Sequence, residues 1–99
     1  MLVLQHGTAS RDYPELDLSF YTNGVLRYSP FTLSYAVTDS SGNTLVGPSA
    51  KPWCKSVGLY VPNFIVDIAW VPGIYTITYT YRNQHYESER TRTQQFEVL

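Results

Sequence analysis

A long run of alternating residues near the C-terminal end constrains the fold more than any other feature of this chain. It begins at the turn dipeptide Pro72-Gly73 and extends to Tyr81. Tyrosine and isoleucine occupy one face of the run and threonine the other, because successive side chains of a strand point to opposite faces. Such residues suit a pleated, half-buried surface, and no helical period fits the run. It therefore predicts a long strand over residues 73–82.

Further alternating runs, with turn residues about every ten positions, predict an all-β fold. Seven or eight short strands in 99 residues are typical of a single antiparallel β-sandwich, and no linker or repeat divides residues 1–99 into more than one domain. Cys54 is the one cysteine, so the sandwich has no disulfide. The other expected strands cover residues 15–22, 25–27, 31–38, 44–46, 56–61 and 64–70, with an edge strand at the N-terminus and a last strand ending at Val98.

The N-terminal segment, residues 1–14, combines that edge strand with a polar, irregular arm between Gly7 and Pro14. Such an arm is a natural docking element, so we expect the sandwich to fold without residues 1–13. Residues 47–55 are expected to form a loop, because Gly47, Pro48 and Pro52 lie within them. Residues 83–89 are expected to form a polar loop, and residues 39–43 a turn.

Aromatic residues are more numerous than one small core requires: nine tyrosines, four phenylalanines and two tryptophans. The alternation directs one set inward, namely Phe20, Phe31, Tyr35, Phe64, Tyr75, Ile77, Tyr79 and Phe96, and Trp70 shares the register of Phe64, Val66 and Ile68. Other tyrosines fall on loops or the opposite face. They indicate either an interface, where tyrosine is enriched, or ordinary strand propensity. The candidate interface residues are Arg11, Tyr13, Tyr21, Tyr28, Trp53, Arg82, Tyr86, Arg90 and Arg92.

Composition and charge disfavour several partners. The net charge is −1 and the cations are scattered, so no basic stripe for nucleic acid is present. No segment approaches the ~20 apolar residues of a membrane-spanning helix, and the residues from Met1 to His6 have neither the basic region nor the long apolar region of a signal peptide. The absence of disulfides favours a reducing compartment, so synthesis in a cytoplasm is expected. Charged residues are 15% of the chain, against ~25% in typical soluble domains, which leaves more surface for protein contact.

No catalytic, cofactor-binding or metal-binding residues are expected. Cys54 lies between two lysines that favour a thiolate, but His6 and His85 lie in terminal or loop regions with no supporting pattern. We expect a half-buried loop cysteine beside Trp53. His85, Glu87 and Glu89 are an unspecific metal-ligand set, and no phosphate loop or nucleophile elbow occurs.

Two resemblances follow from the turn motifs. The Pro72-Gly73-x-Tyr75-x-Ile77 segment resembles the penultimate strand of immunoglobulin-like sandwiches, where a corner tyrosine precedes a buried position. Antibody domains have cysteine at that buried position, so the likeness is to disulfide-free immunoglobulin-like domains. Together with the Asn23-Gly24 hairpin and the Asp39-x-x-Gly42-Asn43 turn, in that order, the motifs resemble small immunoglobulin-like domains of tailed-bacteriophage virion proteins.

This second resemblance implies a non-enzymatic structural protein of the virion, made in the host cytoplasm. Capsid decoration or cementing is the first expectation, and a neck, tail or baseplate adaptor or fibre-base protein is the alternative. Multivalent contact with other virion proteins would come from residues 8–14, 47–55 and 82–92. A carbohydrate-binding module is the alternative of another class, with Trp53, Trp70 and Tyr60 as candidate sugar platform.

Overall fold

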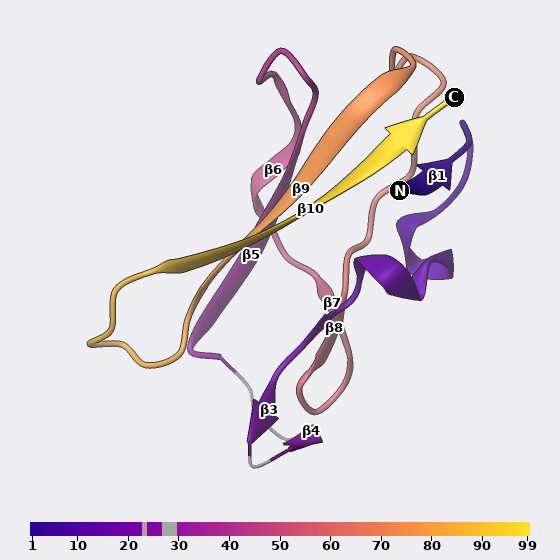
Figure 1. Ribbon diagram of the computed structural model, residues 1–99. Helices are drawn as coiled ribbons and strands as arrows, with labels where there is room; N and C mark the ends of the chain where they lie inside the picture. The colour runs from indigo at the N-terminus through magenta and orange to yellow at the C-terminus, as the bar shows by residue number, and fades with distance from the viewer. Residues whose placement is uncertain (23, 27–29) are drawn as a thin grey trace.

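The computed structural model describes residues 1–22, 24–26 and 30–99 as two packed β-sheets with very little helix (Figure 1). The predicted all-β sandwich is confirmed. Cys54 is a free thiol, as a fold without disulfides requires. In chain order the elements are β1 (Leu2–Leu4), the 3₁₀ turns η1 (Ser10–Asp12) and η2 (Pro14–Leu16), β2 (Leu18–Ser19), β3 (Tyr21–Thr22), β4 (Val25–Leu26), β5 (Thr32–Thr38), β6 (Thr44–Ala50), β7 (Trp53–Ser56), β8 (Leu59–Val61), β9 (Gly73–Arg82) and β10 (Arg90–Val98).

The larger sheet has the strand order β1-β10-β9-β5-β6. The predicted strand over residues 73–82 is confirmed as β9, which pairs antiparallel with β10 and β5. Strand β1 pairs parallel with the end of β10, opposite Phe96, Glu97 and Val98. The alternation that predicted β9 also sets its two faces, because Tyr75, Ile77 and Tyr79 are buried.

The smaller sheet has the order β2-β8-β7, and the β3–β4 hairpin lies at one end of it (Figure 1). The inward face predicted for residues 15–22 is correct, since Leu16, Leu18 and Phe20 are all buried. Gly24 adopts a φ of +78°, as a tight hairpin turn requires. Asn23, its predicted partner in the turn, lies outside the described residues.

The core between the sheets is rich in aromatic rings. Four of them, Phe64, Trp70, Tyr75 and Phe96, stack with centroid separations of 5.2 to 6.0 Å. The inward placement predicted for Trp70 is therefore correct, although residue 70 does not lie in a strand. The hydroxyl of Tyr75 donates a hydrogen bond to the Val71 carbonyl, which is the bond that a corner tyrosine makes to backbone upstream.

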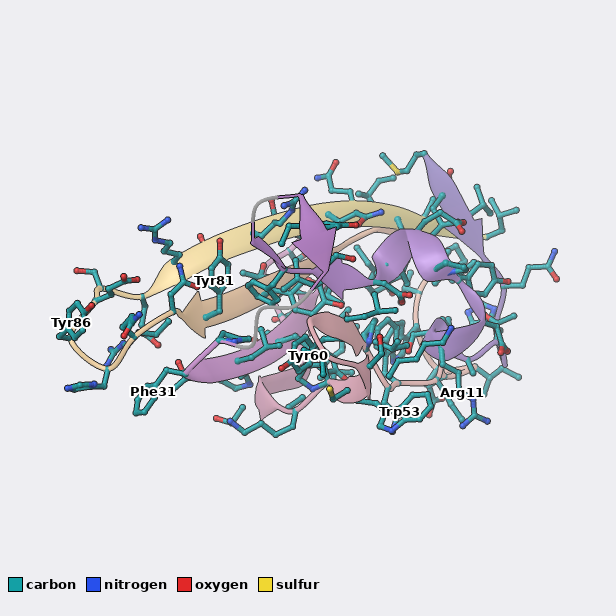
Figure 2. All side chains as sticks on the ribbon, turned by 90° about the horizontal axis from the view of Figure 1, so that it is seen from below. Arg11, Phe31, Trp53, Tyr60, Tyr81 and Tyr86 are labelled. Atoms are coloured by element: carbon teal, nitrogen blue, oxygen red, sulfur yellow. The ribbon has the colours of Figure 1, made fainter. Side chains whose placement is uncertain are left out.

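Phe31 is the one residue of the predicted inward aromatic set that is exposed, at 60%. It precedes β5 at the far end of the larger sheet, where Figure 2 shows its ring at the margin of the molecule. Leu33, the next inward position, is already buried. Sequence alternation predicts on which face of a strand a side chain lies, but not where the opposing sheet ends. The predicted inward position of Phe31 was therefore wrong.

The strand predicted over residues 64–70 is also wrong. Phe64 and Val66 are buried, but the segment runs along the N-terminal arm with only an isolated bridge between Ala9 and Ile65. It then turns, because the Asp67 carboxylate accepts a hydrogen bond from the Ala69 amide and its carbonyl accepts one from the Trp70 amide. This Asp-initiated turn leaves Ile68 85% exposed.

Residues 47–55 are more regular than predicted. Strand β6 continues through Gly47 and Pro48 to Ala50, with shifts in its register against β5. An edge strand tolerates proline, and Gly47 is required because a Cβ there would collide with the Tyr35 carbonyl. Strand β7 then begins at Trp53.

Residues 56–61 do not form one strand, because Val57 and Gly58 make the turn between β7 and β8. Val57 is exposed, whereas Val61 is buried. The turn predicted at residues 39–43 is correct: the Asp39 carboxylate accepts hydrogen bonds from the amides of Ser41 and Asn43.

Candidate functional site

A surface pocket of about 250 Å³ lies where the N-terminal arm meets the smaller sheet. Arg11 reaches it from η1 and Trp53 from the start of β7, and Figure 2 shows the two side chains on the same side of the molecule. Val61, Pro62 and Asn63 complete the lining. We call this site the Arg11–Trp53 pocket; it unites two of the predicted contact segments, residues 8–14 and 47–55.

The arm is fixed beside the pocket by Ser10, which is fully buried. Its hydroxyl donates to the Pro62 carbonyl and accepts from the Phe64 amide, both at 2.8 Å, and its own amide donates to the Phe64 carbonyl. Because Leu4 and Leu16 are also buried in the core, the segment is part of the packed domain. The expectation that the sandwich folds without residues 1–13 therefore conflicts with this packing.

Trp53 is positioned by the pairing of β7 with β8. It lies directly opposite Val61, so the two side chains are on the same face of the smaller sheet. Val61 is only 3% exposed whereas Trp53 is 58% exposed. The indole therefore covers an apolar floor and still offers most of its own surface.

The pocket combines an exposed indole, a guanidinium with five donor groups and the amide of Asn63. Tryptophan and arginine are among the residue types enriched at the few positions that dominate binding energy in protein interfaces. The guanidinium can also hold a carboxylate in bidentate geometry. This arrangement is suited to binding a side chain of a partner protein.

Cys54 is exposed on β7, which corrects the prediction of a half-buried loop cysteine. Its thiol donates to the Ser56 carbonyl at 3.2 Å. His6 instead contacts the Trp70 carbonyl at 2.7 Å, and the His85 ring lies next to Phe31 and Tyr86. Within residues 1–22, 24–26 and 30–99, no group of three or more metal-binding side chains comes together.

A second group of candidates lies at the opposite end of the molecule, in the hairpin between β9 and β10 (Figure 2). Tyr86 is 73% exposed, and its ring lies 5.4 Å from that of His85, which lies 5.9 Å from Phe31. Arg82, at the end of β9, is half-buried, and its Nε atom is buried with no hydrogen-bond partner among the described residues.

A third group lies between the two sheets, where Tyr21 and Arg92 line a pocket with Glu15 and Asp17. Burial raises the pKa of the Asp17 carboxyl. The positive charge of Lys55 acts to lower this pKa, and the negative charge of Glu15 acts to raise it further. One oxygen of Asp17 is buried without a hydrogen-bond partner in the described part of the chain.

The remaining candidates have separate outcomes. Arg90 is exposed at the start of β10. Tyr13 is half-buried and packs against the core, and its role at an interface stays a prediction. Tyr28 lies outside the described residues. Sequence reasoning missed Asn63, which lies between the strands expected over residues 56–61 and 64–70.

Comparison with known proteins adds no relative: a scan against protein-family models, a search of curated proteins and a search of solved structures each returned no match. Among the helices of the described residues, none is long and apolar enough to cross a membrane.

Proposed function

We propose that this protein is a non-enzymatic structural component of a tailed-phage virion that docks on a neighbouring virion protein through the Arg11–Trp53 pocket. The observation that carries the docking role is the indole of Trp53, mostly exposed above buried Val61 and beside Arg11. A large apolar ring held in one orientation by its strand binds with little loss of side-chain entropy.

Two features support an immunoglobulin-like class of sandwich. The first is the hydrogen bond from Tyr75 to the Val71 carbonyl, at the start of the next-to-last strand. The second is the larger sheet, in which β10, β9 and β5 are consecutive neighbours and β6 extends the sheet beyond β5. This order corresponds to the extended sheet of variable-type domains, with the three-stranded sheet opposite.

The virion assignment rests on the order of the three turn motifs along the chain. Capsid decoration is our first choice, because one small domain with a rigid contact site suits a repeating shell, where many weak contacts act together. A neck, tail or baseplate position is the alternative.

The test of this assignment is quantitative mass spectrometry of density-purified phage particles, scaled to the major capsid protein. A copy number close to that of the shell protein supports decoration. A small multiple of three or six moves the protein to the neck or tail. Absence from the particles refutes the virion assignment.

The docking site is tested by adding purified variants to particles that lack the protein. Trp53→Ala should weaken binding about 30-fold, because truncation of a central tryptophan typically removes about 2 kcal/mol or more. Tyr86→Ala is the matched control, since Tyr86 is equally an exposed aromatic but lies at the opposite end of the molecule. If only the control variant loses binding, the docking site is the β9–β10 hairpin and our assignment of the pocket is wrong.

Trp53 also suits a second function, the stacking of a sugar ring. Of the other two residues in the predicted platform, Trp70 packs in the core and Tyr60 is half-buried. Tyr60 pairs with Cys54, so its side chain is on the opposite face of the smaller sheet from Trp53. Glycan-array binding that is lost in Trp53→Ala would favour this function; no binding by the wild-type chain would exclude the tested sugars.

A further inference from the structure

The polar side chains that line the Arg11–Trp53 pocket all carry hydrogen-bond donors. In the described part of the chain, the Arg11 guanidinium forms no hydrogen bond or ion pair, and the indole N–H of Trp53 has no acceptor. The Asn63 backbone amide donates to the Tyr35 hydroxyl, but the Asn63 side chain is exposed and makes no hydrogen bond within the same residues. The pocket therefore presents N–H groups from three side chains to a ligand.

The positive charge of the pocket is not balanced by an acidic lining. None of the described residues that line the pocket is acidic. Asp12 follows Arg11 in the chain, but it is exposed and forms no ion pair with the guanidinium. The Pro62 carbonyl, an acceptor in the lining, is already bonded to the buried Ser10 hydroxyl. One positive charge surrounded by donors is complementary to an anion.

The apolar walls of the pocket favour one kind of anion. The indole of Trp53, Val61 and Pro62 form these walls. Val61 is only 3% exposed but does not belong to the core cluster between the sheets, so it contributes a separate apolar floor. A phosphate carries nearly two negative charges, whereas the pocket contains one guanidinium. A carboxylate on an aliphatic stem therefore fits both the charge and the walls.

The size and position of the pocket indicate a side chain as its occupant. The volume of about 250 Å³ is below the ~300–1,000 Å³ of pockets that enclose small molecules. Strand β7, which carries Trp53, is an edge strand of the smaller sheet in the described part of the chain. Arg11 and Trp53 are both exposed on the same side of the molecule (Figure 2). A partner segment can therefore pass over the pocket and place one side chain in it.

Two lysines next to Trp53 in the chain favour an acidic segment. Lys51 and Lys55 lie two residues before and two residues after Trp53, and both are exposed. The charge of Lys55 acts on Asp17, whereas Lys51 forms no ion pair among the described residues. Cations around an interface attract a partner of opposite charge and disfavour a basic one.

We propose that the pocket binds a glutamate side chain from an acidic segment of the partner protein, a specificity that rests on the docking role proposed above. The carboxylate would accept two parallel hydrogen bonds from Arg11, with the Asn63 amide as a further donor. The two methylene groups of the glutamate would lie against Val61 and Pro62. An apolar residue next to the glutamate in the partner would cover the exposed part of the Trp53 indole.

A blocked dipeptide, acetyl-leucyl-glutamyl amide, is the probe that tests the proposal, and acetyl-leucyl-glutaminyl amide is its uncharged control. The chain has two tryptophans, so nuclear magnetic resonance of the indole N–H groups compares Trp53 with Trp70, which packs in the core. The glutamyl probe at roughly 1–20 mM should shift the Trp53 signal and leave the Trp70 signal in place. The glutaminyl control should bind about tenfold more weakly, because it lacks the charge-assisted hydrogen bonds.

Removal of the guanidinium is the matching change in the protein. Arg11→Gln should weaken binding of the glutamyl probe about tenfold, and it should fold normally because Arg11 is exposed. Arg90→Gln, at an exposed arginine at the start of β10, is the matched control and should bind like the wild type. Equal shifts with both dipeptides, no shift with either, or unchanged binding by Arg11→Gln would overturn the proposal. Tighter binding of acetyl-leucine would also overturn it, because the ligand would then be a chain terminus.

Binding to particles that lack the protein separates this proposal from the docking role. Arg11→Gln should weaken particle binding about tenfold and reduce its dependence on salt. If Trp53→Ala loses particle binding and Arg11→Gln does not, the docking role is supported and the acidic partner is wrong. If Trp53→Ala keeps full particle binding while the wild-type chain binds the glutamyl probe through Arg11, the docking role is wrong and the carboxylate site is supported.

Discussion

Replacement of Ser10 by alanine tests whether the N-terminal arm is part of the folded domain. Ser10 is fully buried, and its hydroxyl satisfies the Pro62 carbonyl and the Phe64 amide at once. Alanine has nearly the same volume but neither donates nor accepts. Ser10→Ala therefore leaves two backbone groups without partners in a site from which water is excluded.

The expected loss follows from those two groups. An unsatisfied buried donor or acceptor costs about 1–3 kcal/mol, so the two together should lower the free energy of unfolding by about 2–6 kcal/mol. Small domains are stable by only about 5–15 kcal/mol. For a chain of this length, each 1 kcal/mol corresponds to a decrease in Tm of about 4–8 °C. The variant should therefore unfold at least 8 °C below the wild type.

Urea unfolding, followed by tryptophan fluorescence and circular dichroism, measures the change. Thr8→Ala is the matched control, because the Thr8 hydroxyl also bonds to a backbone carbonyl, that of Gln5, but in an exposed position. Thr8→Ala should change the free energy of unfolding by no more than about 0.5 kcal/mol. Equal stabilities of Ser10→Ala and Thr8→Ala would show that the arm is separable from the sandwich, and our account of the pocket geometry would then be wrong.

Two further predictions concern carboxylates with shifted pKa values. Burial raises the pKa of Asp17 above 3.8, so the ionised carboxylate destabilises the folded state. Asp17→Asn should therefore raise the free energy of unfolding at pH 7. It should have no such effect below pH 3.8, where the carboxyl is protonated in both the folded and the unfolded state. Hydrogen bonds from Asn43 lower the pKa of Asp39 below 3.8, so its stabilisation is present above that pH and is lost as the pH falls through the folded-state pKa. Asp39→Ala should therefore destabilise at pH 7, with a difference from the wild type that shrinks in acid. Urea unfolding at several pH values checks both, and a pH-independent difference in either variant would contradict the assigned cause.

The sequence was informative where one face of a strand is buried along its whole length. Strand β9 has its predicted bounds because aromatic and β-branched residues alternate without interruption between Pro72-Gly73 and the polar loop. Residues 64–70 alternate equally well but do not form a strand. A segment that packs against the N-terminal arm buries alternate residues just as a paired strand does. In residues 64–70, only the turn that the Asp67 carboxylate initiates distinguishes the packed segment from a strand.

The candidate site was predictable by residue type but not by position. Arg11 and Trp53 each suggested an interface, yet nothing in the pattern indicated that they would share one pocket. Their proximity depends on the hydrogen bonds of Ser10 to the segment after β8, and a single serine in a polar arm carries no such signal. The inward prediction for Phe31 failed for a related reason. How far the opposing sheet extends depends on tertiary packing, which the alternation of residues does not indicate.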